Sequence, residues 1–188
     1  MSLFTSQREK RLWIFVITVI VAIYATLGLA LKMAGYLQNQ DLQAVFFLLG
    51  MFFVGITIVT DGLMVRPGGA EIAIVFGIVA VYFMAFTRIT LFEERSHLIE
   101  YSVVAVFIYE ALNERKRNGQ RVPFPAIITI ILTSLAGLLD EIIQLFIPNR
   151  VFDLQDIVFN TLAAVLSMIA ILLLSWARKQ IWKRKKAK

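Results

Sequence analysis

The sequence predicts an all-α fold, a polytopic integral membrane bundle of about six transmembrane helices. Hydrophobic residues make up 59% of the chain and charged residues only 17%, whereas soluble domains are roughly 45–50% apolar and about 25% charged. Several apolar stretches approach the length of about twenty residues that a helix needs to cross a bilayer. We therefore expect residues 1–188 to form a single transmembrane domain with no appended soluble domain.

The composition also excludes several classes of function. The chain has no cysteine, which excludes disulfides, thiolate metal sites and cysteine nucleophiles. It contains no P-loop, no G-x-G-x-x-G and no H-E-x-x-H motif. The net charge of +6 is distributed over the flanks of apolar segments, as the positive-inside tendency predicts. We therefore expect the lipid bilayer, and no nucleic acid, as a partner.

The first three predicted spans lie in the N-terminal half. The apolar run 12–31 is too long for the core of a signal peptide, and we interpret it as a retained first span. A polar hairpin leads to the second span, and an R-P-G-G turn precedes the third. The predicted bounds of the second and third spans are about 43–60 and 72–86.

The last three spans carry most of the polar residues. The fourth begins near His97 and is followed by a basic loop. Pro123 and Pro125 open the fifth, in the first-turn position where proline is tolerated. A basic tail follows the sixth span, and we expect it to be an interfacial anchor that favours anionic lipids. The predicted bounds are 97–112, 126–146 and 156–176 for the spans and 178–188 for the tail.

The distribution of Lys and Arg predicts that both termini are cytoplasmic. In that orientation the inside segments hold three in the leader, Arg66, four in the loop 115–121 and seven in the tail, fifteen in all. The outside segments hold only four, and such an asymmetry sets the orientation of membrane proteins. These four are Lys32, Arg88, Arg95 and Arg150.

The stretch 140–160 lies between two long apolar runs and begins with two adjacent carboxylates, Asp140 and Glu141. An ionised carboxylate costs roughly 2.5 to 3.5 kcal/mol at the centre of a transmembrane helix, so such groups face a bundle interior or a water-filled cavity. Helical spacing places Asp140 on one face with Gly137 and Gln144, while Glu141 points to the adjacent face. We therefore expect the two carboxylates to have different partners.

Two further helix starts carry polar faces. One lies in the first turn of the fourth span, with residues at i, i+3 and i+4, and the other in the sixth span. In the predicted orientation both lie at the extracytoplasmic side, as Asp140 does, so we predict an outward-facing pocket. The two faces consist of His97, Glu100 and Tyr101, and of Asp153, Asp156 and Asn160.

The residue types predict two sets of roles in this pocket. Histidine and carboxylates exchange protons or bind metal ions, and arginine, amide and hydroxyl groups recognise polar or anionic ligands. The predicted catalytic set is His97, Glu100, Asp140, Glu141 and Asp156, and the predicted substrate-binding set is Tyr101, Gln144, Arg150, Asp153 and Asn160.

Each prediction has a structural alternative. An ion pair with Arg95 or Arg150 would make the adjacent carboxylates a brace between helices. His97, the only histidine, could be an ordinary interfacial residue. The acids of the sixth span, Asp153 above all, could simply stabilise the dipole of that helix.

A known family has a similar pattern. His97 with Tyr101, then Asp140-Glu141-x-x-Gln144, then Arg150, Asp153, Asp156 and Asn160 resembles the VanZ-like family over about residues 93–166, whereas residues 1–90 match only as hydrophobic spans. Members usually carry a glycine three residues after the asparagine, and this chain has Ala163, which still allows close helix packing. The resemblance implies work at the extracytoplasmic face of a bacterial envelope, associated with low-level teicoplanin resistance.

Three classes of function stay open at this point, and catalysis is not decided. A resistance factor would recognise a lipid-linked cell-wall precursor or a glycopeptide without turnover. A membrane-embedded enzyme would act on a lipid-linked substrate, and oxygen and nitrogen ligands without sulfur suit magnesium, manganese or zinc, so a divalent metal is one alternative. A proton-coupled transporter is disfavoured because the acids gather toward one side.

Overall fold

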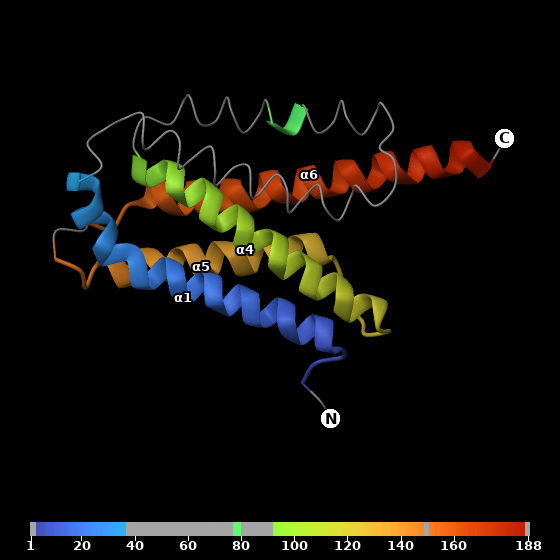
Figure 1. The fold of residues 1–188 in the computed structure, drawn as a ribbon, viewed down its shortest axis with the longest axis horizontal. Coiled ribbons are helices and arrows are strands. Elements are labelled where there is room, and N and C mark those ends of the chain that lie inside the picture. Colours follow the sequence, from blue (N-terminus) through green and yellow to red (C-terminus); the bar gives the residue numbers. More distant parts are fainter. Residues whose placement is uncertain (1–2, 37–76, 80–91, 149–150, 187–188) are drawn as a thin grey trace.

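A computed structural model describes residues 3–36, 77–79, 92–148 and 151–186. The regular structure in these ranges is helical, as the sequence predicts, and α4 contacts the three other helices. Figure 1 shows that α4 and α6 begin at the end of the bundle where α5 ends. The second predicted span and most of the third lie outside the described residues. The helices are α1 (Gln7–Tyr36), α4 (Phe92–Arg117), α5 (Pro125–Gln144) and α6 (Leu154–Lys186), with a short helical piece at 77–79.

Two of the described helices are long and apolar enough to cross a membrane. They are α5 over its whole length and α6 over Leu154–Gln180. The first and fourth predicted spans are helical as well and lie within α1 and α4. The chain thus has membrane character, while six spans and cytoplasmic termini stay predictions.

The first residues of the predicted basic loop after the fourth span belong to a helix. The helix α4 continues to Arg117, five residues beyond the predicted end. Gly119, with φ 84°, then ends it in a Schellman motif, in which the amide of Gln120 donates to the carbonyl of Arg115 at 3.2 Å. Basic residues in a last turn also complement the helix dipole, so the charges that suggested a loop stabilise a helix end.

The predicted basic tail is also mostly helical, because α6 continues to Lys186. No glycine or proline interrupts the sequence between Leu154 and that residue. Hydropathy marks the end of an apolar segment, but only a helix breaker or a cap ends the backbone hydrogen bonding. The helix therefore extends ten residues beyond the end of the predicted span at 176, while the candidate span within it ends at Gln180.

The helix α5 buries its polar residues and exposes its apolar ones. A soluble amphipathic helix does the reverse, but a membrane helix can present hydrocarbon to lipid and polar groups to the bundle. Pro125 is its first residue, as predicted. Its buried residues are Thr129, Thr133, Gly137, Asp140, Glu141 and Gln144, and its exposed ones include Ile127, Ile131, Leu135, Leu139 and Ile142.

Small residues let the helices pack closely around this polar face. Ala163 of α6 is fully buried and packs with Leu98 and Tyr101 of α4. The closest approach is at Gly137 of α5, where an added Cβ would lie 2.7 Å from both the Cβ and the Nδ2 atoms of Asn160. The crossing of α5 and α6 therefore requires glycine at this position.

We expect Gly137→Ala to lower the stability of the purified protein by about 1–3 kcal/mol, because the added methyl group overpacks the crossing. Gly77→Ala is the matched control, since an added Cβ there meets nothing within 4 Å. The check is thermal unfolding of both variants in the same detergent. Equal melting temperatures for the two variants would contradict the close crossing.

Candidate functional site

One histidine lies between two carboxylates where α4 and α6 begin and α5 ends. The Nδ1 atom of His97 is 3.7 Å from Oδ2 of Asp140, and its Nε2 atom is 3.7 Å from Oδ2 of Asp156. The three side chains come from three different helices and are buried, with 4%, 0% and 8% exposure. A ring with a carboxylate beside each nitrogen can accept a proton on one side and release one on the other.

Tyr101 supports the imidazole from its own helix. The two side chains are four residues apart on α4, and their rings stack with centroids 5.9 Å apart and planes 23° from parallel. Tyr101 is fully buried against Ala163. Its ring therefore restricts how the plane of His97 can turn.

Glu141 has partners that differ from those of Asp140. Its Oε1 atom accepts a hydrogen bond from Nε2 of Gln144 at 2.8 Å, and its Oε2 atom accepts one from the backbone amide of Asp153 at 3.0 Å. The first bond lies within α5, and the second ties α5 to the segment that leads into α6. The adjacent carboxylates thus have separate environments, as their angular separation on the helix predicts.

The side chain of Asp153 caps α6. It is exposed, and its Oδ1 atom accepts a hydrogen bond from the amide of Gln155 at 2.8 Å. This is the geometry of an N-cap residue, which satisfies one of the free amides of the first turn. The structure supports the helix-start interpretation of Asp153, and its role in binding a substrate stays a prediction.

The cluster also has the donor set of a metal site. His97, Asp140 and Glu141 each offer one ligand atom, and the three atoms lie within 4.8 Å of one another in a buried environment. One imidazole nitrogen with two carboxylate oxygens is a donor set that suits zinc or manganese. Asp156 lies on the other side of the ring and could orient His97 from there, as second-shell carboxylates do.

Two polar side chains extend the cluster along the interface of α5 and α6. Asn160 and Thr133 are fully buried, and their side-chain polar atoms make no hydrogen bond to the described part of the chain. Buried polar groups are costly unless they are satisfied. The interface next to Asp140 therefore suits water molecules or the polar group of a ligand.

Two further predicted site residues have a different standing. Glu100 is partly buried and lies within electrostatic range of Asp140, and its predicted catalytic role stays a prediction. Arg150 lies outside the described residues, as does the side chain of Arg95. The alternative in which one of these arginines pairs with the carboxylates is thus not tested.

The first span contributes one residue, Tyr24, that the sequence pattern did not indicate. The hydroxyl of Tyr24 donates a hydrogen bond to the carbonyl of Ala136 at 2.8 Å and lies within electrostatic range of Asp140. This bond connects α1 to α5 one helical turn before Asp140. A tyrosine in the middle of an apolar run was the available signal, since a buried hydroxyl usually needs a partner.

The comparisons with known proteins agree with this pattern. A family model described as VanZ/LLP1 matches residues 15–175, a wider range than the predicted resemblance over 93–166. Comparison with curated proteins gave no match, and comparison with solved structures gave none either. Because the family model covers most of the chain, this protein belongs to the VanZ-like family, which is linked to glycopeptide resistance.

Proposed function

We propose that this protein acts at the extracytoplasmic face of a bacterial cell envelope and contributes to teicoplanin resistance through the cluster of His97, Asp140, Glu141 and Asp156. The observation that carries the proposal is the buried imidazole between two carboxylates. Ionisable groups inside a membrane are costly and mark functional sites by default. The excess of Lys and Arg in the other loops supports an outward orientation.

In this proposal the interface of α5 and α6 recognises the ligand, a lipid-linked cell-wall precursor or the glycopeptide itself. Asn160 and Thr133 offer a buried amide and a buried hydroxyl to its polar group. The exposed apolar face of α5 offers a surface for a lipid tail. Arg150, in the loop between the two helices, would bind an anionic group of the ligand.

A second candidate is a metal-dependent enzyme that acts on a lipid-linked envelope substrate. The close donor atoms of His97, Asp140 and Glu141 favour it. A bound divalent ion would polarise a substrate oxygen or activate a water molecule. Asp156, beside the other ring nitrogen, would then orient His97. A proton-coupled transporter is less favoured, because the buried histidine and carboxylates of α5 and α6 gather at one end of the described helices.

We expect Asp140→Asn and Glu141→Gln to give folded protein that no longer confers resistance, since each amide keeps the packing but loses the charge. Glu114→Gln, at the other end of α4, is a matched control that keeps resistance. Teicoplanin susceptibility and melting temperature should be measured together. Wild-type resistance in both site variants, or a loss of resistance that follows a loss of stability, would contradict a functional site.

The metal candidate has its own test. If the cluster binds a divalent ion, titration calorimetry with Zn²⁺, Mn²⁺ or Mg²⁺ should show one saturable site, which His97→Ala weakens by about tenfold or more. Glu114→Gln should bind as the wild type does. Absence of saturable binding to the wild type would eliminate the enzyme candidate and leave recognition without turnover.

The proposed orientation is testable because the chain has no cysteine. Val151→Cys, at a position 82% exposed before α6, should react with an impermeant thiol reagent in intact cells. Gln120→Cys, at the exposed end of α4, should react only after the cells are opened. The reverse pattern would place the cluster at the cytoplasmic face.

A further inference from the structure

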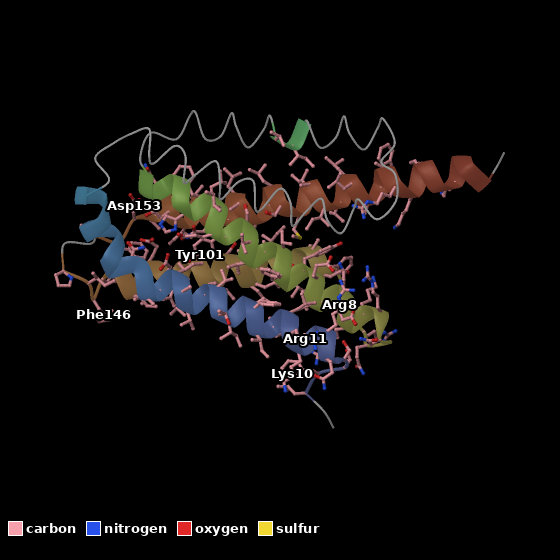
Figure 2. All side chains as sticks on the ribbon, in the orientation of Figure 1. Arg8, Lys10, Arg11, Tyr101, Phe146 and Asp153 are labelled. Carbon is pink, nitrogen blue, oxygen red and sulfur yellow. The ribbon has the colours of Figure 1, made fainter. Side chains whose placement is uncertain are left out.

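A second polar site lies at the opposite end of the bundle from His97. There α1, α4 and α6 line a cavity of about 570 Å³. Figure 2 shows Arg8, which lines it, near the end of α4 that lies opposite Asp153. The charged residues that line it are Arg8, Lys116, Arg117, Arg178, Lys179 and Glu110.

The cavity is strongly cationic, with five basic side chains and one carboxylate. Glu110 lies 3.5 Å from Arg8, and Glu114 lies 3.9 Å from the same guanidinium group. Both acids thus lie within ion-pair range of Arg8, while Lys116, Arg117 and Lys179 form none of the ion pairs found among the described residues. Like charges from two helices around one cavity create a positive potential that attracts an anion.

The rest of the lining has an apolar wall and two uncharged polar residues, Asn113 and Ser175. Val106 and Leu174 are buried, and Tyr109 and Ile171 complete the apolar wall. The candidate span of α6 ends at Gln180, which places Arg178 and Lys179 in its last turn. Trp176, 58% exposed on the same helix, is typical of the interfacial aromatic belt. An apolar wall together with cationic side chains at the end of a candidate span fits a lipid better than a soluble anion.

We propose that this cavity binds the phosphate group of an anionic phospholipid. The guanidinium group of Arg117 would offer paired hydrogen bonds to phosphate oxygens, which is the geometry that arginine provides, and Lys116 and Lys179 would add positive charge. The acyl chains would lie against the apolar wall. The bound phosphate would offset the repulsion between the basic ends of α4 and α6 and hold these helices together. This proposal does not rest on the proposed role of the His97 cluster.

The test compares two double variants with the same change in charge. Arg117→Gln with Lys179→Gln removes two exposed cations from the cavity, and Arg121→Gln with Lys183→Gln removes two exposed cations outside its lining. Melting of the purified full chain is followed in detergent doped with phosphatidylglycerol or with phosphatidylcholine. The single variant Lys179→Gln guards against a double variant that does not fold.

Phosphatidylglycerol should raise the melting temperature of the wild type by several degrees, and phosphatidylcholine should not. Removal of each cavity cation should lower the apparent affinity for phosphatidylglycerol roughly fivefold, which is the usual contribution of one basic residue near an anionic surface. The outer double variant should respond as the wild type does. Equal losses in both double variants, or an unchanged response in the cavity variants, would overturn the site. An equal shift with inorganic phosphate alone would overturn the lipid as its ligand.

Discussion

The structure depends on the inverted polarity of α5, a helix that is apolar outside and polar inside. In a hydrocarbon environment Asp140 and Glu141 cannot find water on the outer face, so their partners must come from the bundle. Those partners come from α4, from the start of α6 and from α5 itself. Each neighbouring helix is positioned by the need to satisfy this face, and the cluster forms where the three helices meet.

Asp140 and Glu141 can reach their partners because the helices pack closely. Gly137 lets Asn160 approach the backbone of α5, and Ala163 lets α6 approach α4. Two carboxylates and an imidazole can share a buried volume only if the helices that carry them come within a few ångströms, which larger side chains would prevent. The buried charged residues therefore need the small residues beside them.

Helical periodicity predicted which residues of α5 face inward, because side-chain direction follows from spacing alone. The meeting of His97 with Asp140 and Asp156 also followed from helix ends that share one side. The individual hydrogen-bond partners could not be predicted from the sequence. The bond from the Asp153 amide to Glu141, for example, depends on the path of the connection between α5 and α6. The helices α4 and α6 extend beyond the predicted spans, because charged residues end an apolar segment without ending a helix. The basic cavity had no local signature, since α1, α4 and α6 each supply part of it.

The uninterrupted course of α6 has a mechanical consequence. Asp156 and Lys179 lie on one helix without glycine or proline, about 35 Å apart at 1.5 Å per residue. A helix without a hinge turns as one rod, so any rotation that draws Asp156 away from His97 swings the far end through the same angle. The two ends of α6 therefore move together, and a group that fixes one end also limits how far the other can move.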